Sequence, residues 1–316
     1  MKALQQIIGR VAANRAQPFA LATLVQTEGS TYRKPGARLL VEANGTTLGV
    51  LSGGCLEEEI GRYGRRVIND DDSAVLLSFD TRRLYGCDGR LKILVERLPA
   101  AGQKGNLITK VGRLVAQRDI CRIRTCFEGG PLGSELLPAD ILLAERPGVF
   151  VETVPLAVRL LLFGTGPEIE PVTQLAGSLG WMVEHFGHPS ELGEHFRPDA
   201  QTAALIMNHN FGRDLLALDR LLAFRLRYVG LLGPRKRHAE LLSRLGEYRP
   251  LDFNAGARNL FAPAGLDIGS EAPEEIALSI TSEIAAVLSG RRGGFLRERK
   301  SDIHATNVVA AGGEAA

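Results

Sequence analysis

One cysteine of the chain stands in a setting that favours chemistry. Cys55 directly follows Ser52-Gly53-Gly54 at the end of a strand-like run, and it precedes a helix-like segment that opens with three glutamates. Backbone amides point outward at the first turn of a helix, and the helix dipole favours a thiolate there. The glycines allow a sharp turn and let a ligand approach the backbone. Cys55 is therefore the first candidate for a reactive thiol, with a buried structural cysteine as the alternative.

The other three cysteines fall into two groups. Cys87 is also flanked by glycines, in YGCDGR between two strand-like runs, and it is the second candidate. Cys121 and Cys126 occur in an alternating pattern that is typical of a strand, which favours core positions. Four cysteines in 316 residues do not form the disulfide framework of a small secreted domain, so reduced thiols are expected.

Basic side chains precede the first of these cysteines. Arg33, Lys34 and Arg38 lie among small residues in the loop TEGSTYRKPGAR, residues 27–38. Such side chains can neutralise a phosphate, although an ordinary charged loop has the same composition. The formal net charge of the whole chain is only +2, which does not favour nucleic acid as a partner.

A second glycine turn lies in the C-terminal half. Gly164-Thr165-Gly166 follows a short apolar strand and precedes a helix, as in a dinucleotide-binding loop. The third glycine position of that motif holds Ile169, and Gly187 stands where an acidic residue would bind a ribose hydroxyl. A Rossmann-like fold is therefore predicted, with only weak binding of NAD(P). His209 follows a buried strand at the carboxyl edge of the same sheet and is a further candidate for a ligand pocket.

The sequence predicts neither a metal site nor a membrane segment. No common set of metal ligands has the spacing of the histidines in the C-terminal half, His185, His188, His195 and His209. No apolar run approaches the roughly 20 residues that span a bilayer. The N-terminus lacks the long apolar core of a signal peptide. A soluble, cytoplasmic protein is expected.

Strand-like and helix-like runs indicate the organisation of the N-terminal half. An α+β domain is predicted over residues 1–100, with strands at 20–27, 37–43, 46–51, 74–79 and 91–96 and helices near the N-terminus and at 56–68. Residues 101–156 are predicted to form a β-rich appended region and linker, with strand-like pieces near 111–116, 121–127 and 140–145.

The C-terminal half has a different pattern. Short apolar runs alternate with helical segments, which predicts a parallel sheet with crossover helices. This Rossmann-like domain is expected over residues 157–300, with a last helix that starts at Pro273, and residues 301–316 form a tail. The fold class is therefore α/β.

Several of these motifs, taken in order, resemble those of a known family. TEGSTYRKPGARLLV, followed by GVLSGGCLEEEI, resembles the N-terminal signature of the xanthine dehydrogenase accessory proteins, the XdhC/CoxI family. YGCDGRLKILVE resembles the family's second cysteine motif, with Asp88 where a third glycine is usual. LLFGTGPEIEP and YVGLLGPRKRH resemble its Rossmann-type half. The likeness covers most of the chain and is weakest over residues 97–150.

The resemblance implies a maturation factor for molybdenum hydroxylases. Such a protein binds molybdenum cofactor, helps it acquire its terminal sulfur together with a cysteine desulfurase, and delivers it to the apo hydroxylase. A soft thiolate suits molybdenum or a sulfur-transfer step, so Cys55 and Cys87 are assigned to cofactor contact or sulfur transfer. Basic side chains and free amides suit the phosphate of the cofactor. The expected cofactor-binding residues are Arg33, Arg38, Ser52, Gly53, Gly54, Cys55, Gly164, Gly166 and His209.

Two other functions stay open at this point. An NAD(P)-dependent oxidoreductase needs a ribose-binding acid and a proton donor, and the sequence offers only the fold and His209. A docking component of a hydroxylase complex needs no ligand of its own. A homodimer is expected, and the sequence names neither the client hydroxylase nor the place where sulfuration occurs.

Overall fold

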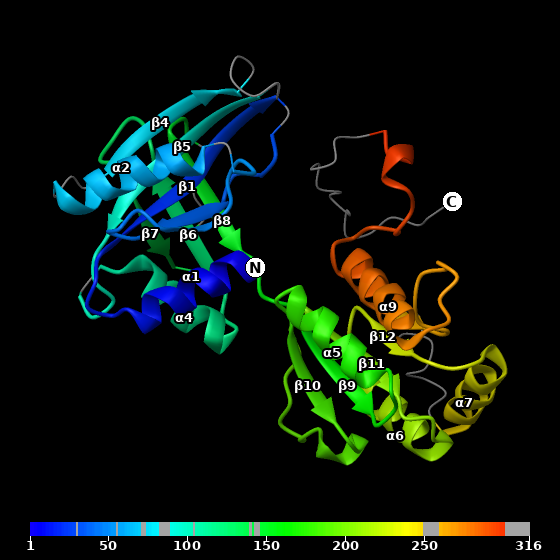
Figure 1. Ribbon diagram of the computed structural model, residues 1–316. Coiled ribbons are helices and arrows are strands. Elements are labelled where there is room, and N and C mark those ends of the chain that lie inside the picture. The colour runs from blue at the N-terminus through cyan, green and yellow to red at the C-terminus, as the bar shows by residue number, and fades with distance from the viewer. Residues whose placement is uncertain are drawn as a thin grey trace. The chain divides into compact units, whose positions relative to one another are not determined.

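The computed structural model describes residues 1–29, 31–54, 56–70, 74–81, 89–103, 105–138, 141, 146–248 and 259–300. The chain divides into two compact units, Met1–Leu156 and Ala157–Ala316, and each is described by itself (Figure 1). Cys55, Cys87 and the tail 301–316 lie outside the described residues.

A five-stranded antiparallel sheet forms the centre of the first unit. Its strand order is β3-β2-β1-β5-β4. The strands are β1 (Phe19–Gly29), β2 (Arg38–Val41), β3 (Thr47–Gly49), β4 (Ala74–Asp80) and β5 (Gly89–Leu98). The first seven residues of β1 are all buried, because elements cover both faces of the sheet at its middle. All five strands were predicted from the alternation of apolar residues.

Helices and a second sheet cover the two faces. Helix α2 (Glu57–Asn69) packs on one face through Ile60 and Val67. The other face packs against α1 (Lys2–Ala13), α4 (Leu107–Gln117) and strand β6 of a three-stranded sheet. That sheet has the order β7-β6-β8, with β6 (Cys121–Cys126), β7 (Gly133–Leu137) and β8 (Val149–Val154).

Helix α4 corrects one prediction. A strand was expected near residues 111–116, but this stretch lies inside the helix. The side chain of Asn106 accepts a hydrogen bond from the Thr109 amide at 2.8 Å and caps the helix start, while Leu107, Ile108 and Val111 form its buried face. The tertiary contact with α1 outweighs the β-propensity of the local valines. Strand β6 confirms the piece at 121–127, and the piece at 140–145 lies mostly outside the described residues.

The second unit contains the predicted parallel sheet. Its strands are β9 (Arg159–Gly164), β10 (Met182–Phe186), β11 (Thr202–Met207), β12 (Val229–Leu231) and β13 (Leu260–Phe261). Neighbouring strands are all parallel, in the order β10-β9-β11-β12-β13. Because β9 is first along the chain, the strand order reverses between β9 and β11, which makes this the topological switch point of a doubly wound fold.

Helices lie on both faces of this sheet. Helices α5 (Ile169–Ser178) and α9 (Pro273–Leu288) pack on one face, and α6 (Phe211–Leu222) and α7 (Arg235–Tyr248) pack on the other (Figure 1). Short 3-10 turns occur at Pro189–Glu191 and Leu296–Glu298. The α/β class and the Rossmann-like sheet are confirmed. Among the described residues, no helix has the length and apolar character required to cross a bilayer.

Candidate functional site

The loops that carry the predicted ligand residues leave the first sheet toward one end. Gly29 at the end of β1 pairs with Gly89 at the start of β5, and Leu39 near the start of β2 pairs with Gly49 at the end of β3. Neighbouring strands are antiparallel, so the ends of β1 and β3 and the starts of β2 and β5 lie at the same side of the sheet. The described residues that adjoin these strand ends are 31–37, 50–54, 56 and 81.

One carboxylate holds the glycine turn after β3 together. Glu57 Oε1 accepts hydrogen bonds from the amides of Leu51 at 2.9 Å and Ser52 at 2.8 Å. Glu57 Oε2 accepts from the Ser52 hydroxyl at 2.7 Å and from the Gly54 amide at 2.9 Å. The side chain of the first residue of α2 therefore closes the turn that leads into the helix.

The charge of Glu57 is stabilised by these donors. Burial alone raises the pKa of this carboxyl, but the hydrogen bonds from Ser52 and Leu51 outweigh that effect, and the pKa lies below its ordinary value of 4.5. The amides of Ser52 and Gly54, expected to be free for a phosphate, are thus already bonded to a carboxylate. Sequence reasoning missed this role of Glu57. The available signal was a glutamate at a helix start, directly after a turn whose amides need acceptors.

The outer side of the same turn is open. Gly53 and Gly54 are exposed and have φ angles of +78° and +110°, which side chains rarely allow. A β-carbon built on Gly54 would meet nothing within 4 Å. A β-carbon on Gly53 would meet only the ring of Tyr32, at 3.9 Å, and that ring is 67% exposed. An exposed aromatic face therefore lies beside an accessible backbone, and Tyr32 is a second residue that sequence reasoning missed.

The two arginines predicted to bind phosphate have different environments. Arg33 is exposed in the loop after β1. Arg38 is buried, its guanidinium forms an ion pair with Glu152 of β8, and it donates to the carbonyl of Gly36 at 3.1 Å. A buried cation requires such a partner. The prediction for Arg38 is therefore corrected, since the side chain joins β2 to β8 and is not presented to a ligand.

The two cysteines that the structure describes, Cys121 and Cys126, both lie on β6. Cys121 is buried in β6, where burial raises the pKa of its thiol, and Cys126 is half-buried at the end of the same strand. Cys55 and Cys87 lie outside the described residues, so their roles stay predictions. The Thr81 hydroxyl donates to the Gly89 carbonyl at 2.7 Å and joins the two ends of the segment that contains Cys87.

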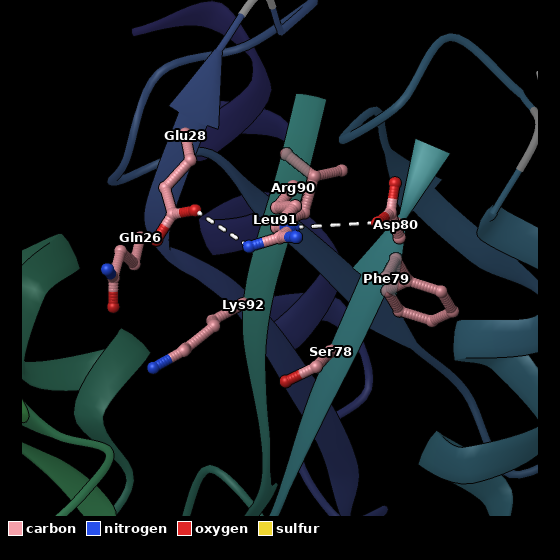
Figure 2. A pocket seen from close by; sticks show the side chains of 8 residues that line it. All are labelled: Gln26, Glu28, Ser78, Phe79, Asp80, Arg90, Leu91 and Lys92. Carbon is pink, nitrogen blue, oxygen red and sulfur yellow. Dashed lines mark ion pairs between the residues drawn. The ribbon is translucent and has the colours of Figure 1, made fainter. Parts of the chain in front are cut away.

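A pocket of about 370 Å³ lies at strands β1, β4 and β5, and charged side chains line part of it (Figure 2). In it, Arg90 lies between Glu28 and Asp80, at 3.6 Å and 3.5 Å. Lys92 pairs with Glu128 at 2.5 Å. Because each of these cations already faces a carboxylate, an anionic ligand would have to displace an ion pair here.

The glycine turn of the second unit is closed by its own chain. A β-carbon on Gly164, which has a φ of +149°, would overlap the carbonyl oxygen of Met207 in the neighbouring strand. A β-carbon on Gly166 would lie 2.6 Å from Glu168 Oε2 and 3.0 Å from His209 Nε2. Those two side-chain atoms are 3.3 Å apart. A carboxylate therefore lies where a pyrophosphate would have to approach.

The end of β10 contains an acid that the sequence pattern did not reveal. The amides of Gly187 and His188 donate to the carboxylate of Glu191 at 3.2 Å and 3.0 Å. His188 also caps the turn that follows, and His185 Nε2 bonds to the Gly164 carbonyl at 2.6 Å. Within the described ranges, no three His, Cys, Asp or Glu side chains are grouped as metal ligands.

Comparisons with known proteins agree with both halves of the chain. The family model of the XdhC and CoxI family matches residues 12–80, and the model of the XdhC Rossmann domain matches residues 160–284. A protein of Bacillus subtilis named as a probable xanthine dehydrogenase subunit is 28% identical, over 84% of this chain and 91% of its own length. The molybdenum cofactor insertion chaperone PaoD of Escherichia coli is 25% identical, over 84% of this chain and 82% of its own.

A solved structure shares the fold. The crystal structure of a xanthine dehydrogenase from Bacillus halodurans matches with a TM-score of 0.77 and 24% sequence identity. The match covers 92% of this chain and 97% of that one, so the likeness extends over both units.

Proposed function

The chain belongs to the XdhC and CoxI family, and we propose on this basis that it is an accessory chaperone for molybdenum cofactor. In this proposal it binds the cofactor as cargo, supports its sulfuration, and inserts it into an apo molybdenum hydroxylase of the xanthine dehydrogenase type. Two relatives support the proposal by their names, one as a molybdenum cofactor insertion chaperone and one as a probable xanthine dehydrogenase subunit.

The observation that carries the proposal is the open turn in front of α2. Glu57 bonds the turn from within, while the exposed sides of Gly53 and Gly54 leave room for a large ligand. Molybdenum cofactor is a pterin with a phosphate and a dithiolene-held metal. The ring of Tyr32 offers an aromatic face for the pterin, and Arg33 offers a cation for the phosphate.

The thiols complete the proposed site. Cys55 follows Gly54 in the chain, and its sulfur is a soft ligand suited to molybdenum or to accepting sulfur from a cysteine desulfurase. Cys87 is the second candidate, on a segment anchored at the same end of the sheet. Gly164, Gly166 and His209 are left out of the cofactor site, because the carboxylate of Glu168 lies over that turn. A homodimer is part of the proposal.

The direct test is cofactor binding under anaerobic conditions, using freshly released molybdenum cofactor. We expect about one cofactor per chain. Cys55→Ala should weaken binding at least tenfold, about 1.4 kcal/mol, and should abolish activation of the client hydroxylase. Its melting temperature should equal that of the wild type, because a small side chain at a glycine-flanked turn contributes little packing.

The matched control is Cys126→Ala, which removes a half-buried thiol from a strand end and should leave cofactor binding unchanged. Binding of the wild type no stronger than that of an unrelated protein would overturn the proposal. Full client activation by Cys55→Ala would remove this thiol from the mechanism.

A second function is favoured by one observation. Glu191 brings a carboxylate to the end of β10, where the adenine ribose of NAD binds in dehydrogenases. The carboxylate of Glu168 at the first turn opposes this function. Titration calorimetry with NAD and NADP decides it. We expect weak binding and no turnover, whereas sub-micromolar affinity or steady hydride transfer would favour an oxidoreductase.

A further inference from the structure

Three side chains at the carboxyl edge of the parallel sheet contain buried polar atoms that make no hydrogen bond. They are Asn208 Oδ1, Arg237 Nε and both ring nitrogens of His238. Asn208 is 8% exposed and His238 is 3% exposed. The other such atoms in the described part of the chain belong to residues of the first unit, one per residue. Buried polar groups are almost always paired, so this group of atoms indicates a place where polar partners belong.

These side chains come from different elements and meet beyond two strand ends. Ile206 of β11 pairs with Leu231 of β12, so Asn208 and Gly233 follow the carboxyl ends of two neighbouring strands. A β-carbon built on Gly233 would lie 3.5 Å from His238 Nε2. Gly233 has a φ of +137°, so a glycine is required where the ring approaches the backbone.

Asp214 of α6 joins the same group. It is buried, accepts a hydrogen bond from Asn208 Nδ2 at 3.1 Å, and forms an ion pair with the guanidinium of Arg237. Helices α6 and α7, which supply Asp214 and Arg237, lie side by side in Figure 1. The carboxylate holds both neighbours in place and leaves one atom of each, Asn208 Oδ1 and Arg237 Nε, without a partner.

The charge at the start of α7 favours an anion. Arg235 and Lys236 are exposed at its first turn, which contains no acidic residue. The positive end of the helix dipole coincides there with two cations, an arrangement that an anion stabilises. Helix α9 shows the usual arrangement, with Glu274 and Glu275 in its first turn.

The atoms without partners include both donors and acceptors. Asn208 Oδ1 can only accept a hydrogen bond and Arg237 Nε can only donate one. Burial lowers the pKa of His238, which keeps the ring neutral at pH 7, with one donor and one acceptor nitrogen. The backbone of Leu232 and the charge of Asp214 partly oppose this lowering of the pKa. Neither group meets the distance and angle of a hydrogen bond to a ring nitrogen. A phosphate only accepts, whereas sugar hydroxyls both donate and accept, so the two together match the site.

We propose that this group of side chains at the carboxyl edge of the sheet, formed by Asn208, Asp214, Gly233, Arg237 and His238, binds a phosphorylated sugar of the kind present in nucleotides. The phosphate lies at the start of α7, near Arg235 and Lys236, and sugar hydroxyls bond to Asn208 and His238. This group borders the glycine turn closed by Glu168, since a β-carbon built on Gly164 would lie 3.3 Å from the amide nitrogen of Asn208. It belongs to the unit that does not contain Cys55 or Cys87. The sugar-phosphate proposal can therefore fail while the molybdenum cofactor proposal holds, and the cofactor proposal can fail while the sugar-phosphate proposal holds.

Titration calorimetry of the full chain tests the proposal with four probes. They are ribose 5-phosphate, ADP, inorganic phosphate and ribose. We expect ribose 5-phosphate to bind at least tenfold more tightly than either inorganic phosphate or ribose. If ADP binds more tightly than ribose 5-phosphate, the ligand is a nucleotide. If the two bind equally, the ligand is a free sugar phosphate. Ribose 5-phosphate that binds no more tightly than inorganic phosphate overturns the proposal.

Two variants separate binding from folding. His238→Phe keeps a ring and removes both unpaired nitrogens, so we expect a higher melting temperature and at least tenfold weaker binding of ribose 5-phosphate. Lys236→Ala should weaken binding about threefold with no change in melting temperature. Its control is Arg244→Ala, an exposed cation about 12 Å further along α7, which should bind like the wild type.

Fluorescence of Trp181, the single tryptophan, reports on folding of this unit. If His238→Phe fails to fold, the comparison of Lys236→Ala with Arg244→Ala decides. Equal affinity of these two variants and the wild type contradicts the proposal.

Discussion

The two glycine turns of the molecule look alike in sequence and differ in structure. Each connects a strand to a helix, and each has a glutamate at or next to the helix start. At Gly53 and Gly54 the glutamate bonds the turn from within and the outer side is open. At Gly164 and Gly166 the neighbouring strand and Glu168 fill the space that a ligand would use. The glycines of the first turn therefore leave the backbone accessible, whereas those of the second turn allow close packing.

The largest expected effect distinguishes these two uses of glycine. Gly164→Ala should destabilise the second unit by about 3–5 kcal/mol, because the new β-carbon overlaps the Met207 carbonyl and the φ of +149° is strained. Gly54→Ala should cost only about 1–2 kcal/mol, from backbone strain alone. Urea unfolding measures both, with Trp181 fluorescence for the second unit and, for the first, the part of the circular dichroism change that does not follow Trp181. Equal losses would mean that the two turns do not differ in packing.

Removing the charge inside the first turn should have the next largest effect. Glu57→Gln keeps the size of the side chain but weakens its bonds to the amides of Leu51, Ser52 and Gly54. Hydrogen bonds to charged groups contribute about 1.5–3 kcal/mol each, so we expect a loss of about 1–3 kcal/mol after partial replacement by the amide. Cofactor binding should fall with it. Glu58→Gln, at the exposed next position, is the control and should leave both properties unchanged.

Acid should affect the two units at different pH values. His238 has a pKa below 6.5, so the folded state disfavours its proton and loses stability as the pH falls below 6.5. Glu57 has a pKa below 4.5, so its contribution is present above pH 4.5 and disappears as the pH falls through its lowered pKa. Trp181 fluorescence should therefore show weakening of the second unit in milder acid than circular dichroism shows for the first. Simultaneous loss would contradict these directions.

The smallest effect concerns access to the second turn. Glu168→Ala removes the carboxylate that lies over Gly166 and pairs with His209. Loss of one repulsive charge at a partly exposed site corresponds to about 1 kcal/mol, so affinity for NAD should rise about fivefold. Calorimetry measures the change, with Glu170→Ala on the first turn of α5 as the control. No gain in affinity would mean that packing alone closes the turn.

Much of the fold was predictable because its signals are local. Apolar alternation marked the strands of the first sheet, and alternating strands and helices marked the parallel sheet of the second unit. The prediction of a strand was wrong for residues 111–116, where contact with α1 favours a helix. It was also wrong for Arg38, because nothing near this residue in sequence indicates Glu152, 114 positions away.

By itself, the sequence determined which residue types stand at the turns, the order of the elements and the family to which the chain belongs. Those properties depend on spacing within one short segment at a time. Only the tertiary structure decided that Glu57 bonds the first turn, that Glu168 and His209 cover the second, and that Asn208, Arg237 and His238 meet with unpaired atoms. The reason is physical. Hydrogen bonds and buried charges depend on distances of a few ångströms between residues whose separation in sequence carries no such information.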